Sequence, residues 1–165
     1  MRSLSFSARG PLVLLLTTLI CGTFADVRGE ELGAKRTLPL SAARKVLAAA
    51  QEHARANNWN VCIAIVDDAG DVKCFERMDG TQAGSVVVAQ KKAETAARFK
   101  RPSKVFEDAV TTGGRNVVLM LPGAVPLEGG IPIVVDGEVI GAIGVSGVTS
   151  QQDSQIAEAG VTALP

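Results

Sequence analysis

The stretch from Gly129 to Gly147 constrains the fold more than any other part of this sequence. Within it, Asp136-Gly137 lies between two β-branched segments, which is the strongest short-range signal for a two-residue hairpin turn. Pro132 lies near the start of the first segment, where a missing N–H costs least. The second segment, from Val139 to Val145, is apolar on both faces. We therefore expect a hairpin whose second strand is central in a sheet.

Two glycines, Gly141 and Gly144, remove side chains from this expected central strand. They serve packing alone, or they allow another backbone, a helix or a ligand to approach the strand closely. We expect such a strand to leave room for a flat ligand.

Upstream of this hairpin the sequence predicts a helix, a second hairpin and a long helix. An apolar stripe at three- and four-residue spacing predicts the first helix over 41–57, with Ser41 as its cap. The apolar run 61–66 and the more polar segment 72–77 flank turn residues and predict the second hairpin. The long helix, over 83–99, places small apolar side chains on one side and charged side chains on the other: Lys91, Lys92, Glu94 and Arg98.

Two further helices complete the order. Pro102 ends the long helix because proline cannot continue it, and Ser103 is expected to cap a short helix to residue 110. A short apolar segment covers 117–121, and Ser150 or Thr149 caps a last helix over 151–164. The fold class is therefore predicted to be α+β, an antiparallel β-sheet built from two hairpins and flanked by helices (order αββααββα).

The first 25 residues have the pattern of a signal peptide. Arg2 and Arg9 precede an apolar run over 11–21, which is too short to span a bilayer. A small residue at position 25 predicts cleavage before Asp26. A lipid anchor at Cys21 fits this sequence less well, because bulky residues precede that cysteine. We expect an exported protein, periplasmic or secreted.

The expected mature chain comprises a flexible arm over 26–38 and one α+β domain over 39–165. Of the 17 basic residues the leader takes two, which leaves 15 against 17 acidic residues. This slightly negative balance argues against nucleic acid or anionic membrane surfaces as partners. Once the leader is removed, we expect no insertion into a membrane.

Two cysteines, Cys62 and Cys74, remain in the expected mature chain. If Ala69-Gly70 forms the turn between their strands, Cys62 lies opposite Arg77 and Cys74 points to the other sheet face. A turn one residue different places the thiols diagonally, about 7 Å apart, beyond easy bridging. We expect two free, buried thiols, and an intermolecular disulfide is the alternative.

The sequence has no strong catalytic motif. It contains no Gly-x-Ser-x-Gly elbow, no phosphate loop and no Cys-x-x-Cys pair. The single histidine, His53, lies near the C-terminal end of the first helix without an acidic residue to orient it. His53 is either a half-exposed helix residue or a metal ligand, and haem or iron suits a lone histidine better than zinc does.

Two charged clusters are candidate binding sites. Arg77 and Asp79, at the end of a strand, line a pocket mouth or pair with each other. Lys100 and Arg101 lie beside the hydroxyl of Ser103 at the corner between two helices. Such a corner can bind an anion or the propionate of a cofactor, and a solvated basic corner is the alternative.

Several stretches together resemble the GlcG/HbpS family of haem-binding proteins, which also occurs as the C-terminal domain of PduO-type corrinoid adenosyltransferases. The resemblance covers residues 38–164. It rests on six motifs: Val66-Asp67-Asp68-Ala69-Gly70, Glu76-Arg77-Met78-Asp79-Gly80, Lys92-Ala93-Glu94-Thr95-Ala96-Ala97, Arg101-Pro102-Ser103, Gly129-Gly130-Ile131-Pro132-Ile133 and Gly141-Ala142-Ile143-Gly144-Val145-Ser146-Gly147.

The resemblance implies a self-associating α+β domain that binds haem and in some relatives degrades it or sequesters iron. Exported relatives work beside a sensor kinase, which implies a membrane sensor partner. A threonine contacts haem iron in one relative, and the resemblance places Ser103 at that position. In the corrinoid-enzyme domain an early histidine serves haem, and His53 is the candidate for it here. The implied haem site comprises Phe99, Lys100, Arg101 and Ser103, and a corrinoid is a related candidate ligand.

Two rival functions remain open. In an enzyme or accessory protein for a small organic acid, Arg77 and Arg101 would hold the carboxylate, and Asp67 or Asp79 would move protons. In a purely structural oligomer, the glycines would serve subunit packing.

Overall fold

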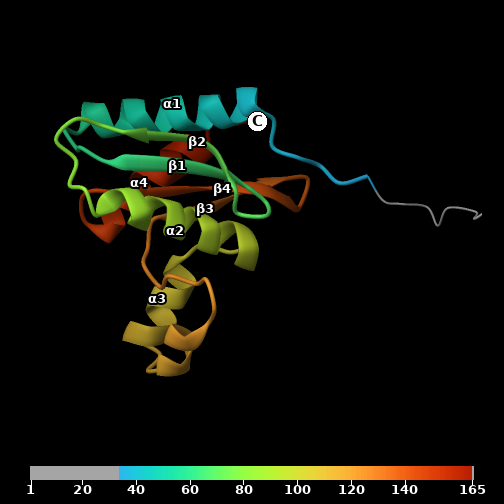
Figure 1. Cartoon of the computed structure of the whole chain (residues 1–165), viewed down its shortest axis with the longest axis vertical. Coiled ribbons are helices and arrows are strands. Elements are labelled where there is room, and N and C mark those ends of the chain that lie inside the picture. Colours follow the sequence, from blue (N-terminus) through green and yellow to red (C-terminus); the bar gives the residue numbers. More distant parts are fainter. Residues whose placement is uncertain (1–33, 165) are drawn as a thin grey trace, which may run out of the picture. The chain divides into compact units, whose positions relative to one another are not determined.

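The computed structural model describes residues 34–164, so the expected signal peptide and most of the expected arm lie outside the described residues. Four strands form one antiparallel sheet in the order β2-β1-β4-β3 (Figure 1). The strands are β1 (Cys62–Asp67), β2 (Val72–Arg77), β3 (Gly130–Val135) and β4 (Glu138–Ser146). Two hairpins thus meet at their central strands, β1 and β4, and the predicted α+β fold with the order αββααββα is confirmed.

The β3–β4 hairpin has the turn that its sequence predicts. Asp136 and Gly137 both have positive φ, 49° and 81°, as a primed two-residue turn requires. β4 is central and buried along most of its length, whereas Pro132 lies on the edge strand β3. Both expectations for this hairpin are confirmed.

The β1–β2 hairpin places its two thiols as expected. Cys62 pairs with Arg77 and Cys74 with Ile65, so the two side chains point to opposite faces of the sheet. Both cysteines are free; Cys62 is buried and Cys74 is half-buried. The carboxylate of Asp67 accepts hydrogen bonds from the backbone N–H groups of Ala69 and Asp71, both at 3.0 Å, and so fixes the turn.

Helices cover both faces of the sheet. α1 (Leu40–Ala56) and α4 (Ser150–Val161) pack on one face, and α2 (Ser85–Phe99) packs on the other (Figure 1). β1 serves both layers, because Ile63 and Ile65 face α1 and α4 while Cys62 and Ala64 face α2. The strand is therefore apolar throughout, as strands buried on both faces are.

The backbone of α2 fills the space that the strand glycines leave. A Cβ at Gly144 would overlap the carbonyl oxygen of Ala89, and one at Gly130 would overlap that of Lys92. At Gly141 a Cβ would overlap the carbonyl oxygen of Val66 on the neighbouring strand. The expectation of room for a flat ligand over these strands is therefore wrong: the close approach is made by the protein itself.

A small lobe projects from the sheet beyond α2 (Figure 1). This α3–η1 lobe, residues 104–127, contains the helix α3 (Lys104–Thr111) and the 3₁₀ helix η1 (Asn116–Met120). Phe106 is the buried residue of α3 and Val118 that of η1. Most of the remaining large apolar side chains of the lobe face solvent.

The helix ends differ in part from the predicted ones. α1 begins at Leu40, with Pro39 rather than Ser41 at the N-cap position. Thr149 caps α4 through a reciprocal pair of hydrogen bonds with Gln152, the second of the two predicted caps. Within the described part of the expected arm, Leu38 is 1% exposed and belongs to the core. Over residues 34–164 none of the helices has the length and apolar character of a membrane span.

Candidate functional site

The corner between α2 and α3 carries four of the six predicted site residues. α2 ends at Phe99, and Lys100 follows in the left-handed conformation, with φ 54°. Its N–H donates to the carbonyl oxygen of Ala97, which closes the last turn of the helix. Pro102 then prevents the helix from continuing, and the chain turns into α3.

The exposed side of this corner combines aromatic rings with positive charge. The Phe99 and Phe106 rings meet edge to face, with centroids 5.2 Å apart. The Arg101 guanidinium lies 5.9 Å from the centroid of the Phe106 ring, and its Nε donates to the carbonyl oxygen of Phe99 at 3.0 Å. Lys100 and Arg101 are exposed and Phe99 is half-buried. The Arg101 cation thus borders the aromatic pair, and Lys100 adds a second exposed cation directly after Phe99 in the chain.

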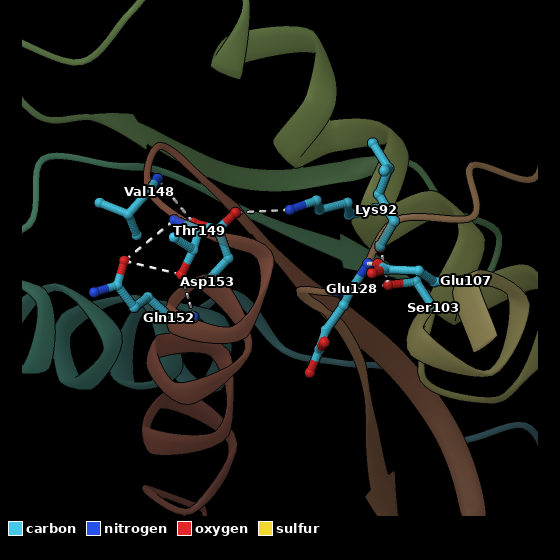
Figure 2. A network of polar contacts seen from close by, with 10 residues as sticks. Lys92, Ser103, Glu107, Glu128, Val148, Thr149, Gln152 and Asp153 are labelled. Atoms are coloured by element: carbon cyan, nitrogen blue, oxygen red, sulfur yellow. Dashed lines mark hydrogen bonds and ion pairs between the residues drawn. The ribbon is translucent and has the colours of Figure 1, made fainter. Parts of the chain in front are cut away.

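Ser103 lies on the inner side of the same corner and is fully buried. Its hydroxyl donates to the carbonyl oxygen of Leu127 at 2.5 Å and accepts from the N–H of Gly130 at 2.9 Å (Figure 2). The prediction that this hydroxyl caps α3 is wrong, because it makes no capping bond. In this structure Ser103 joins the start of α3 to the start of β3.

A buried ion pair lies close to Ser103. Lys92 Nζ is 2.7 Å from a carboxylate oxygen of Asp153, and each side chain is 3% exposed. The pair connects α2 to α4 around the end of β4, where the Val148 N–H also donates to Asp153 (Figure 2). Burial raises the pKa of the Asp153 carboxyl, and the Lys92 ammonium opposes that rise.

The expectation that Lys92 faces outward is therefore wrong. The sequence spacing indicates that Lys92 is buried, because it lies three residues after Ala89 and four before Ala96, which are both on the buried face of α2. Gly129 makes the room: a Cβ there would lie 3.0 Å from Lys92 Nζ.

A second acidic side chain is buried next to the corner. Glu128 is 7% exposed, and one of its carboxylate oxygens accepts no hydrogen bond within the described residues. Lys104 Nζ lies 3.6 Å from that oxygen, and the backbone N–H of Glu128 donates to the carboxylate of Glu107 (Figure 2). These groups fix the loop that enters β3.

The other two predicted site residues lie elsewhere. His53 is half-buried on α1, which covers the opposite face of the sheet, and its ring centroid is 6.1 Å from that of Trp59. Arg77, at the end of β2, donates to the carbonyl oxygen of Thr81 at 2.5 Å and 3.2 Å rather than pairing with Asp79. The structure thus divides the six predicted residues among three places.

Arg77 and Arg101 do not share a carboxylate site. Arg77 bonds to Thr81, which lies four residues before α2 begins, and Arg101 follows soon after α2 ends. A helix of 15 residues, roughly 22 Å long, lies between these two positions. Arg77 instead lines a polar cavity of about 380 Å³ with Arg55, Asn60 and Asp79. The carboxylate of Asp67, another residue of the organic-acid hypothesis, accepts hydrogen bonds from backbone N–H groups of the β1–β2 turn.

Within residues 34–164, histidine, cysteine and acidic side chains form no group of three that could hold a metal ion. The α2–α3 corner combines two exposed cations, Lys100 and Arg101, with an aromatic pair that the Arg101 guanidinium contacts. Such a surface suits a ligand that has a planar apolar body and carboxylate groups.

Comparisons with known proteins agree with this fold. Protein GlcG of Escherichia coli K12 is 44% identical over 104 residues, which are 63% of this chain and 77% of that protein. The structure of an HbpS double mutant from Streptomyces reticuli matches with 29% identity and a TM-score of 0.76, over 96% of this chain and 99% of that one. The structure of a PduOC–haem complex matches with 29% identity and a TM-score of 0.71, over 78% of this chain and 96% of that one.

A family model also matches over residues 38–162, almost the whole described part of the chain; its description reads "haem degrading protein HbpS-like". The predicted GlcG/HbpS relationship is confirmed, and the chain belongs to the HbpS-like family.

Proposed function

We propose that this protein binds haem at the α2–α3 corner. The observation that carries the proposal is the similarity to a domain solved in complex with haem, over 78% of this chain and 96% of that domain. Membership of the HbpS-like family supports the same ligand class.

The corner fits the periphery of a haem better than it fits the iron. Lys100 and Arg101 would pair with the two propionates, and the Phe99 edge would contact the ring. Haem, when bound, would supply iron-centred redox chemistry, or it would itself be the substrate that is degraded. Ser103 fits an iron ligand only if its hydroxyl leaves both Leu127 and Gly130, and His53 lies across the sheet.

The test is a titration of the haem-free protein with haemin, followed by the Soret band. The double variant K100M/R101M is expected to bind at least about tenfold more weakly, because both propionates lose their partners. A matched control is R44M/K45M, which removes an adjacent exposed pair of cations from α1. No spectral change with the unaltered protein would reject the proposal, and the same titration with a corrinoid tests that alternative.

Two variants identify the iron ligand. If His53 is the ligand, H53A shifts the Soret maximum and S103A does not. If Ser103 is the ligand, the reverse holds, although S103A also removes two hydrogen bonds of the fold. A spectrum unchanged in both variants would exclude both residues.

The proposal includes self-association. Val117, Leu119 and Met120 of the α3–η1 lobe are 62%, 59% and 80% exposed, more apolar surface than a solitary chain usually presents in one place. A second copy of the chain would cover it. M120E is expected to lower the molar mass measured by light scattering, and a monomeric unaltered protein would reject this part.

Export and signalling are further parts of the proposal. A protein cleaved before Asp26 would act in the periplasm or outside the cell, in haem or iron sequestration or in redox sensing with a membrane sensor partner. Mass spectrometry of the protein from its native host would detect that cleavage. An intact N-terminus would reject export by this route.

A further inference from the structure

A cavity of about 410 Å³ lies between the tips of the two hairpins and the end of α2. Asp68 of the β1–β2 turn and Gly137 of the β3–β4 turn line it, together with Lys35 and Lys100. This volume is within the range of sites that hold small organic molecules.

Two charged groups that line the cavity, the Lys100 ammonium and the Glu138 carboxylate, form no ion pair within residues 34–164. Lys35 Nζ lies 2.5 Å from a carboxylate oxygen of Asp68. Arg36 pairs with Asp136, and Glu138 adds further negative charge beside it. Lys100, by contrast, pairs with no acidic side chain of residues 34–164.

The backbone at Lys100 is unusual for a lysine. The other non-glycine residues with positive φ in the described chain are Asn58 and Asp136, two residue types that tolerate this conformation. Glycine is the common residue at the left-handed position after a helix. A lysine at this position lowers the stability of the fold relative to a glycine. Its presence therefore points to a use for the charge of its side chain.

The cavity that Lys100 lines also has two apolar side chains. Val134 of the edge strand β3 is 50% exposed, and Val139 of β4 is half-buried. One unpaired ammonium beside two valines suits a ligand with one negative charge and a hydrocarbon body. A phosphate suits this cavity less well, because phosphate sites combine several N–H donors.

We propose that this cavity binds a monocarboxylate, whose carboxylate pairs with Lys100 and whose hydrocarbon part lies on Val134 and Val139. The carboxylate belongs either to a free short-chain acid or to the propionate arm of a haem. With a free acid the proposal goes beyond haem binding, because the acid would occupy the cavity in the haem-free protein. With a propionate arm it rests on the proposed function and adds the cavity that receives the arm.

The experiment uses hexanoate as the free acid and compares haem with its dimethyl ester, which lacks the propionate charge. Hexanoate is titrated into the ¹⁵N-labelled haem-free protein, and the two tetrapyrroles are titrated by absorbance. The variants are K100M and K100G, with R44M/K45M as the matched control. K100G is expected to remain folded because glycine favours the left-handed conformation, so loss of binding in this variant reports the missing charge.

Two results support the proposal and identify the source. In the first, hexanoate shifts the amide signals of Val134, Gly137 and Val139. Both Lys100 variants then weaken the affinity for hexanoate at least about tenfold, while the control variant does not. In the second, hexanoate has no effect, but haem binds at least about tenfold more tightly than its ester only when Lys100 is present.

Two results overturn it. One is hexanoate binding that the Lys100 variants leave unchanged. The other is no response to hexanoate combined with no Lys100-dependent preference for haem over its ester. Hexanoate binding without any haem binding would reject the proposed function and leave the carboxylate site standing.

Discussion

Two lysines of the same polypeptide segment, eight residues apart, have opposite roles. Lys92 is 3% exposed and pairs with Asp153 inside the protein, whereas Lys100 is exposed and pairs with no acid of the described chain. Lys92 joins two helices that lie on different faces of the sheet. The comparison teaches that a charge on this segment belongs to the fold where the backbone makes room for it, and faces solvent, where a ligand can reach it, once the helix has ended.

The largest expected effect comes from removing the interior charge. K92M leaves the Asp153 carboxylate buried without its cation, which is expected to lower the free energy of unfolding by about 3–5 kcal/mol at neutral pH. K100M removes an exposed charge and should change it by less than about 0.5 kcal/mol. Urea unfolding of both variants measures the contrast, and equal losses would contradict it.

A rescue experiment sharpens the same contrast. In K92M/D153N no buried carboxylate remains, so part of the lost stability is expected to return. If the double variant is as unstable as K92M, the loss comes from packing rather than from the unpaired charge.

Closing the space beside Lys92 is the next largest effect. In G130A the new methyl group overlaps the carbonyl oxygen of Lys92, and the expected cost is about 3 kcal/mol because two backbones have to separate. G137A has open space around its new Cβ, although its positive φ adds strain. The thermal midpoint of G130A should therefore lie below that of G137A, and the reverse order would contradict this account.

Ser103 connects the interior to the corner. In S103A the Gly130 N–H and the Leu127 carbonyl oxygen both lose a buried partner, at an expected cost of about 2 kcal/mol. S103T keeps the hydroxyl and should lose less. Equal stability of S103A and the unaltered protein would show that water replaces these bonds.

The pH dependence of K92M has a definite sign. Burial raises the pKa of Asp153, and the loss of Lys92 removes the group that opposes this rise. A carboxyl whose folded pKa lies above its unfolded value contributes stability at low pH that is lost as the pH rises through the folded pKa. The deficit of K92M is thus expected to shrink from pH 7 to pH 5, and a deficit that grows would contradict it.

The smallest effect is a gain of stability. K100G relieves the left-handed strain at the end of α2 and is expected to add about 1 kcal/mol. N58G is the control, since asparagine already tolerates its φ of 56° and should gain less. A K100G variant no more stable than the unaltered protein would remove the argument that this lysine is kept at a cost.

The sequence predicts the sheet because its signals are local. Asp136-Gly137 carries its own turn geometry, and the continuous apolar run of β1 follows from burial on both faces. The positions of Lys92 and of the strand glycines depend on what packs against them, which a single sequence does not contain. A lysine can be buried only when a distant residue, here Asp153, supplies the counterion.

The candidate site was predicted in part for the same reason. Lys100 and Arg101 are exposed as a broken helix end implies. The sequence neighbours of Ser103 predict a helix cap, yet its hydrogen-bond partners are Leu127 and Gly130, more than twenty residues away. His53 and Arg77 share no local feature with the corner, and the topology places them elsewhere.

The two thiols have a consequence for biogenesis. Cys62 and Cys74 lie on opposite faces of the sheet, so its backbone stands between their sulfur atoms, and burial raises the pKa of both thiols. Little thiolate forms at neutral pH, and thiolate is the species that oxidants attack. Residues 34–164 can therefore reach the same covalent state in a reducing cytosol and in an oxidising compartment, without help from a disulfide-forming enzyme.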